Sequence, residues 1–281
     1  MIESFKTADG RTLAYRRAGD GPVLVCHPGG PGLSSTYFAD FGGLGESFDL
    51  VLLNPRGTDG SDRTPTYGLG GYVSDLEELR AHLGLEDMNL IGHSHGGFVA
   101  IAYASEHPSR VRRLVLSCTA ARFHEPQQQA MEQARASREN EPWYEDANAA
   151  LERELAGDFA SDEELAELVV REFAFYFWRF DDAARKFLRD YVAVELPNRE
   201  ALAYFNDQEF TTLDLRPNLA RIKSPTLVLT GVDDFICGRV CAADLTEGIA
   251  GAASLLLEDC GHFPYFEQRD RFRQEVTKFL A

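Results

Sequence analysis

A serine flanked by glycines stands where an apolar run gives way to a helix-like segment. In Gly92-His-Ser-His-Gly-Gly97, Ser94 follows the apolar run that ends at Ile91 and precedes the small, apolar residues 98–104. This pattern matches G-x-S-x-G, in which a tight strand-to-helix turn exposes the serine hydroxyl above a sheet. Backbone N–H groups at the start of the following helix favour developing negative charge. Ser94 is therefore a candidate nucleophile for acyl transfer.

A serine nucleophile needs a histidine base and a carboxylate that orients this base, and both residue types follow late apolar runs. Gly231-Val-Asp-Asp234 follows the run 226–230, and His262 follows the last expected strand. The chain order serine, acid, histidine is the one that accompanies this type of turn. His262 is the candidate base, while position alone allows either Asp233 or Asp234 to be the acid.

A glycine-rich loop follows an earlier apolar run and could stabilise an oxyanion. His27-Pro-Gly-Gly-Pro-Gly32 comes directly after residues 23–26. Glycine lets a backbone N–H face a substrate without interference from a Cβ atom. Because oxyanion stabilisation is usually the largest catalytic contribution, we expect the N–H groups of Gly30 and His95 to form this site.

These residues require a scaffold, and the sequence predicts a mostly parallel sheet flanked by helices. Short apolar runs bounded by Gly and Pro alternate with helical patterns, which is typical of an α/β fold. The expected strands are residues 12–17, 22–27, 48–54, 88–92, 113–118, 225–231 and 254–258, and the expected helices are 72–83, 97–106 and 271–280.

The α/β alternation stops between residues 122 and 221, where the pattern predicts an inserted helical cap. The core domain would then comprise residues 1–121 and 222–281. Residues 141–200 contain 16 acidic and 7 basic side chains, a net charge of −9. Two interpretations remain open: a solvated helix surface, or a negative field over a pocket that attracts amines or other cations. The aromatic stretch 173–178 would pack in the cap or roof the pocket.

Composition excludes several functional classes. The 281 residues include 45 acidic and 28 basic side chains, a net charge of −17, which argues against a nucleic-acid binder. No apolar run is long enough to cross a membrane, and the first residues do not resemble a secretory signal. Five cysteines without a CxxC pair indicate neither a disulfide framework nor a zinc site. We therefore expect a cytoplasmic protein that uses no metal and no cofactor.

The motifs resemble the α/β-hydrolase superfamily and, within it, the proline iminopeptidase (prolyl aminopeptidase) family. Residues 27–32 resemble the H-G-G-P-G loop of this family, and residues 54–61 resemble its D-x-R-G-x-G-x-S segment. Residues 92–97 match its G-x-S-x-G-G turn, and residues 231–237 resemble its G-x-x-D-x-x-C stretch. Residues 260–267 resemble the histidine loop that is common in hydrolases of this fold. The resemblance implies an α/β-hydrolase fold with a helical cap, and it assigns the acid to Asp234. The chain departs from the family at Pro28, Asn54 and Asp59.

The resemblance also implies cap glutamates that hold the free α-amino group of a substrate, for which Glu172 and Glu200 are the candidates. In so acidic a cap, the alternative is that both are solvated. The expected activity is release of an N-terminal residue from small peptides. A small-molecule carboxylesterase, lactonase or C–C bond hydrolase would use the same three residues, and a binding receptor of this fold is a more remote alternative. The sequence indicates no oligomeric state.

Overall fold

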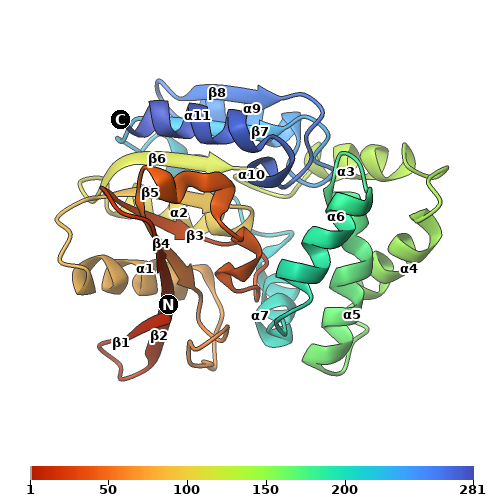
Figure 1. Ribbon diagram of the computed structural model, residues 1–281, viewed down its shortest axis with the longest axis horizontal. Coiled ribbons are helices and arrows are strands. Elements are labelled where there is room, and N and C mark those ends of the chain that lie inside the picture. Colours follow the sequence, from red (N-terminus) through yellow and green to blue (C-terminus); the bar gives the residue numbers. More distant parts are fainter. Residues whose placement is uncertain (1) are drawn as a thin grey trace.

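An eight-stranded sheet forms the centre of the molecule in a computed structural model that describes residues 2–281 (Figure 1). The strands are β1 (Ile2–Lys6), β2 (Thr12–Ala18), β3 (Val23–His27), β4 (Asp49–Asn54), β5 (Met88–His93), β6 (Val111–Ser117), β7 (Thr226–Gly231) and β8 (Ala253–Leu257). Their order in the sheet is β1-β2-β4-β3-β5-β6-β7-β8. The pairs β1–β2 and β2–β4 are antiparallel, and the other neighbours are parallel.

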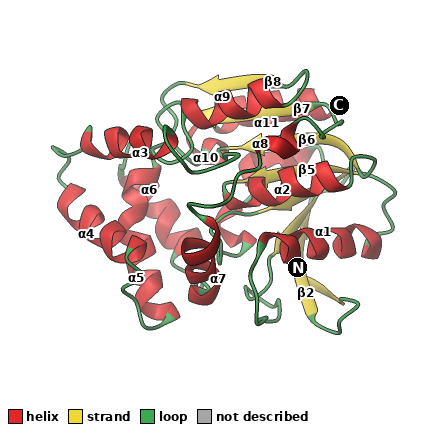
Figure 2. Ribbon diagram, turned by 180° about the vertical axis from the view of Figure 1, so that it is seen from behind, coloured by secondary structure: helices red, strands yellow, loops and turns green. Residues whose placement is uncertain are grey.

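The central strands are buried on both faces, as their continuous apolar runs predict. On β5, Leu90 belongs to one apolar cluster and Ile91 to the other, because successive side chains point to opposite faces. The helices α1 (Leu69–His82), α2 (His95–Glu106) and α9 (Arg239–Gly248) cover the first face (Figure 2). The C-terminal helix α11 (Arg269–Leu280), with the short α10 (Pro264–Glu267) and the turns η1 (Ser35–Phe38) and η2 (Phe41–Glu46), covers the second.

The chain between β6 and β7 forms a group of helices beside the sheet. These are α3 (Gln127–Ala136), α4 (Tyr144–Leu155), α5 (Asp162–Glu172), η3 (Phe173–Tyr176), α6 (Asp182–Phe187), η4 (Leu188–Val192), α7 (Arg199–Tyr204) and η5 (Phe205–Glu209). They lie at the end of the sheet toward which the parallel strands point (Figure 1). The last helix of this segment, α8 (Arg216–Leu219), instead packs against α2 and α9 of the core.

A third apolar cluster packs the helices between β6 and β7, the cap, against the core. Leu151 of α4 and Phe175 of η3 pack with Phe235, which belongs to the loop after β7. The rings of Phe175 and Phe235 lie 5.5 Å apart between centroids. This contact places the cap helices directly above the loops in which open parallel sheets hold their ligands.

The predicted architecture is confirmed: a mostly parallel sheet carries helices on both faces. The sequence patterns did not predict β1 or α9. The strand β1 is an edge strand with mostly exposed or half-buried side chains, so it has no apolar run. None of the helices in residues 2–281 is both long and apolar enough to span a bilayer.

Candidate active site

Ser94 occupies a strained turn between β5 and α2. Its backbone angles are φ 55° and ψ −126°, a region that non-glycine residues rarely occupy. The N–H of Ser94 donates to the Ser117 carbonyl (3.1 Å), and the Thr119 hydroxyl donates to the Ser94 carbonyl (2.7 Å). A Cβ on Gly96 would lie 2.3 Å from the His27 carbonyl oxygen, so only glycine permits this close packing of the turn on the neighbouring loop. The surrounding structure thus holds Ser94 in its strained conformation.

Asp234 and His262 form a buried hydrogen-bonded pair. His262 Nδ1 lies 2.7 Å from Asp234 Oδ2, and the N–H groups of Ile236 and Cys237 donate to Asp234 Oδ1, each at 3.0 Å. Burial raises the pKa of Asp234, but the charge and hydrogen bond of His262 and the two backbone donors outweigh burial and lower it. An ionised Asp234 accepts the Nδ1 proton, so Nε2 is the nitrogen left as a base.

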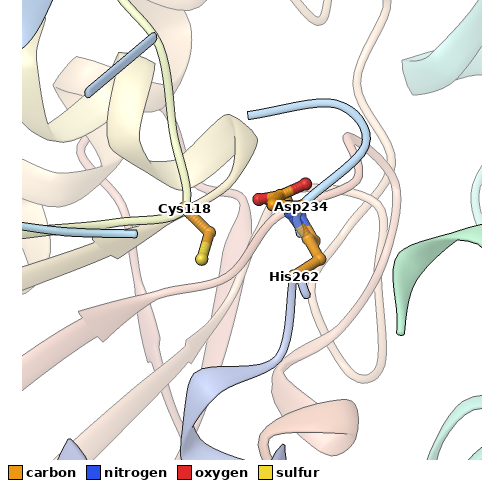
Figure 3. A group of neighbouring side chains, drawn as sticks. All are labelled: Cys118, Asp234 and His262. Carbon is orange, nitrogen blue, oxygen red and sulfur yellow. Dashed lines mark hydrogen bonds and ion pairs between the residues drawn. The ribbon is translucent and has the colours of Figure 1, made fainter. Parts of the chain in front are cut away.

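Cys118 lies beside this pair at the end of β6 (Figure 3). The Cys118 sulfur, one Asp234 oxygen and one His262 nitrogen all lie within 4.8 Å of one another. Burial, and then the charge of Asp234, raise the pKa of the Cys118 thiol well above its usual value. A neutral thiol is a poor metal ligand, and Asp234 and His262 already bond to each other, so these residues fit a buried contact better than a metal centre.

The glycine-rich loop lies against Ser94. A Cβ on Gly29 would lie 2.5 Å from the Ser94 Cβ and 3.0 Å from its Oγ. The Gly29 N–H donates to the Tyr37 hydroxyl at 2.6 Å. Within residues 2–281 we find no acceptor for the N–H groups of Gly30 and His95. These two donors, selected from the sequence, are therefore free to bind an oxyanion.

A cavity between the core loops and the cap brings the candidate residues together. The core contributes Gly30, Ser94 and His262, and the cap contributes Glu154, Glu172 and Asn206. The remaining lining is mainly aliphatic and aromatic and includes Leu151, Leu165, Val169, Phe173, Tyr176, Phe205, Phe235 and Ile236. Ser94, the candidate nucleophile, thus faces an apolar cavity whose lining includes two carboxyl groups.

Glu154 and Glu172 are both buried, so ionisation of either carboxyl group costs free energy because the charge is removed from water. Burial raises the pKa of Glu154 to about 7, although Asn206 donates a hydrogen bond to its carboxylate at 3.2 Å. Burial, and then the charge of Glu154, raise the pKa of Glu172 well above its ordinary value. Oε2 of Glu172 has no hydrogen-bond partner among the described residues. The pair can therefore accept an ammonium group, whose charge would offset the cost of ionisation.

Glu200, the second cap glutamate selected from the sequence, lies outside the cavity lining. Its side chain is 48% exposed, and its carboxylate lies 3.6 Å from Arg63. The expectation that Glu200 contacts the substrate is corrected on this geometry: Glu200 stands at the first turn of α7 and faces solvent. Glu154, on α4, lines the cavity together with Glu172, although the sequence analysis did not select it.

The raised pKa values predict a pH-dependent stability. A carboxyl group whose pKa is higher in the folded than in the unfolded protein stabilises the fold below its ordinary pKa of 4.5, and this contribution is lost as the pH rises through 7. At about 1.4 kcal/mol per pKa unit, Glu154 alone corresponds to about 3 kcal/mol. Between pH 5 and pH 8, the Glu154→Gln/Glu172→Gln variant should therefore lose less unfolding free energy in urea than the native chain. Equal losses in both proteins would contradict the assigned burial.

Comparison with known proteins agrees with the observed fold. Residues 22–268 match the model of the alpha/beta hydrolase fold family. The chain belongs to this family. A proline iminopeptidase from Lactobacillus helveticus is 30% identical, with the alignment covering 100% of this chain and 98% of the relative. The proline iminopeptidase PfmaB from Pestalotiopsis fici is 28% identical over 100% of this chain and 99% of that protein. The resemblance predicted from the motifs is thus confirmed.

Solved structures of other hydrolases share the same architecture. The enol-lactonase from Burkholderia xenovorans is 26% identical, superposes with a TM-score of 0.69 and covers 99% of both chains. This hydrolase family therefore includes relatives of this chain with different substrates, and the substrate must be inferred from the cavity.

Proposed function

We propose that the protein is a serine aminopeptidase of the proline iminopeptidase type, which releases the N-terminal residue of small peptides. The observation that carries this proposal is the pair of buried carboxyl groups, Glu154 and Glu172, in the same cavity as Ser94 and His262. The full-length relatives named proline iminopeptidase support the same activity.

The proposed reaction is a two-step acyl transfer. His262 Nε2 takes the proton of the Ser94 hydroxyl as Oγ attacks the carbonyl carbon of the first residue, and the N–H groups of Gly30 and His95 stabilise the oxyanion. Collapse of the tetrahedral intermediate breaks the C–N bond, and His262 gives its proton to the departing amine. Asp234 stabilises the imidazolium during both transfers. Water, deprotonated by His262, then hydrolyses the acyl-enzyme and regenerates Ser94.

The carboxyl pair would bind the α-ammonium group of the substrate. The two carboxyl groups interact, so they titrate as a pair, and the charge of one opposes ionisation of the other. An incoming ammonium favours the ionised forms and gains charge-assisted hydrogen bonds in a water-poor site. The apolar lining around the pair suits a small hydrophobic side chain such as the prolyl ring. Because the pair recognises an N-terminal amine, the proposed enzyme is an exopeptidase.

A carboxylesterase or lactonase is the second candidate. The apolar lining of the cavity and the likeness to the enol-lactonase favour it. This reading leaves unexplained the burial of two carboxyl groups, which an ester substrate does not need.

All five cysteines are free and buried, which fits the cytoplasmic location that we propose.

Steady-state hydrolysis of prolyl p-nitroanilide and p-nitrophenyl butyrate by the purified protein tests the proposal. We expect cleavage of the prolyl anilide with a kcat/KM of about 10⁴ M⁻¹ s⁻¹ or more, the lower end of the range for natural substrates. Cleavage of the ester alone would overturn the aminopeptidase assignment in favour of the esterase. Absence of both activities would contradict both candidates.

A further inference from the structure

We propose that Tyr37 and His93 are positioning residues that hold the oxyanion loop (residues 28–32) and the loop of His262 in a fixed relation through one hydrogen-bonded chain. The inference rests on the proposed roles of Gly30 and His262. Neither Tyr37 nor His93 has a role in the mechanism above, yet both lie at the cavity wall beside Ser94.

Three hydrogen bonds form the chain. The Gly29 N–H donates to the Tyr37 hydroxyl at 2.6 Å, the Tyr37 hydroxyl lies 2.8 Å from His93 Nδ1, and His93 Nε2 lies 2.8 Å from the His262 carbonyl oxygen. The chain thus begins at the backbone of one loop and ends at the backbone of the other. Its middle member, His93, directly precedes Ser94 in the turn.

The two ends fix the direction of every bond in the chain. A backbone N–H can only donate, so the Tyr37 oxygen accepts from Gly29, while the neutral, Nε2-protonated form of His93 leaves Nδ1 to accept the Tyr37 hydrogen. A carbonyl oxygen can only accept, so His93 Nε2 carries the proton and donates it to His262. The structure therefore assigns one tautomer to His93, and no member of the chain is left without a partner.

Burial keeps this arrangement unchanged near neutral pH. Tyr37 and His93 are only 4% and 1% exposed. Burial, and then the nearby charge of His262, lower the pKa of His93 to about 3, and burial raises the pKa of Tyr37. His93 therefore stays neutral at neutral pH. The hydrogen-bonded chain is then a fixed structural support, and its protonation does not contribute to the pH dependence of the activity.

The surroundings hold both side chains in place. Asn54 Oδ1 accepts from the N–H (3.1 Å) and the hydroxyl (2.6 Å) of Ser35, which begins the turn η1 that carries Tyr37. The Tyr265 ring packs edge-on against His93, with centroids 5.6 Å apart. Asn54, one of the departures from the family motif, thus anchors the turn that supports the oxyanion loop.

The chain matters for catalysis because Gly29 lies against the nucleophile. A Cβ on Gly29 would lie 3.0 Å from Ser94 Oγ, so a small shift of this loop changes the distance between the Gly30 N–H and the reacting carbonyl. Displacements of about 1 Å can lower a rate about 100-fold. Loss of this hydrogen-bonded chain should therefore reduce kcat while the cap still binds substrate normally.

The test is Tyr37→Phe, which removes the hydroxyl and leaves the ring. We expect kcat to fall about 10- to 100-fold with KM within about threefold and an unchanged shape of the pH profile. Tyr15→Phe is the matched control, because Tyr15 of the strand β2 is also buried and its hydroxyl donates a hydrogen bond to Glu3 of β1 at 2.9 Å. His93→Gln is a second variant and should lower kcat in the same way.

The rate of Ser94 phosphonylation by a fluorophosphonate separates this inference from the proposed substrate. This reagent needs the base and the oxyanion site but no N-terminal amine. We expect Tyr37→Phe to react about 10- to 100-fold more slowly than the native chain at equal thermal stability. If the native protein reacts and Tyr37→Phe reacts at the same rate, the proposed role of Tyr37 and His93 is wrong. If the native protein itself does not react, the serine mechanism is wrong.

Discussion

Ser94→Ala should lower kcat/KM for any substrate of the native protein by about 10,000-fold or more. The substitution removes the oxygen that forms the acyl-enzyme but leaves the cavity, the Asp234–His262 pair and the free N–H donors intact. The KM of any residual activity of the variant should be close to that of the native protein, because alanine adds no atom to the cavity. The measurement is steady-state hydrolysis together with labelling by a fluorophosphonate, which should fail in the variant.

Ser74→Ala is the matched control for this prediction. Ser74 lies exposed on α1, outside the cavity, so its substitution should leave both turnover and labelling unchanged. If Ser94→Ala retains more than about one tenth of the activity, another group is the nucleophile and the assigned mechanism is wrong.

The Glu154→Gln/Glu172→Gln variant should lose about 100- to 1000-fold in kcat/KM on prolyl p-nitroanilide, since an ammonium without its buried counter-charge costs about 3–4 kcal/mol. Any hydrolysis of p-nitrophenyl butyrate by the native protein should stay within about threefold in the variant, because this ester carries no ammonium group. The ratio of the two rates therefore reports amine recognition separately from the chemistry at Ser94.

A control variant with the same charge change distinguishes binding from long-range electrostatics. Glu163 and Glu167 lie exposed on α5, the helix that ends with Glu172. Glu163→Gln/Glu167→Gln should change kcat/KM by less than about threefold, since exposed charges are screened by salt. Equal losses in both double variants would show that the acidic cap attracts the substrate by its overall field and does not bind the amine in a defined site.

The sequence predicted the core of the site because its positions follow from local backbone requirements. A buried strand, a turn that needs small residues and a helix follow one another at Ser94, and parallel strands bring their carboxyl ends to one edge of the sheet. The loops after β7 and β8 must therefore lie close to Ser94. This topology explains why Asp234 and His262, 28 residues apart, hydrogen-bond to each other.

The cap residues were harder to predict because acidic side chains on a helix are usually solvated. Helical spacing contained the missing signal. Glu154 follows the buried residues Ala147, Ala150 and Leu151 at i+7, i+4 and i+3, and Glu172 stands in the same relation to Leu165, Leu168 and Val169. Each glutamate thus continues the apolar stripe that a helix buries. On α7, Glu200 precedes the buried Ala201 and lies outside the buried face of this helix.

The chain from Gly29 through Tyr37 and His93 to His262 was not accessible from sequence patterns. Directly bonded members are separated by up to 169 residues, and each contact depends on how two loops and one turn pack around Ser94. Loop conformations of this kind follow from tertiary packing, which residue spacing does not encode.

The most direct test of the central claim, that this cavity recognises a free N-terminal amine, compares kcat/KM for prolyl p-nitroanilide and N-acetylprolyl p-nitroanilide with the native protein at pH 7. The two compounds share the scissile bond and the prolyl ring and differ only in the charged amine. We predict that acetylation lowers kcat/KM at least about 100-fold, because Glu154 and Glu172 then face a neutral amide. Equal hydrolysis of both compounds would show that the buried carboxyl pair does not bind the substrate amine and would contradict the proposed function.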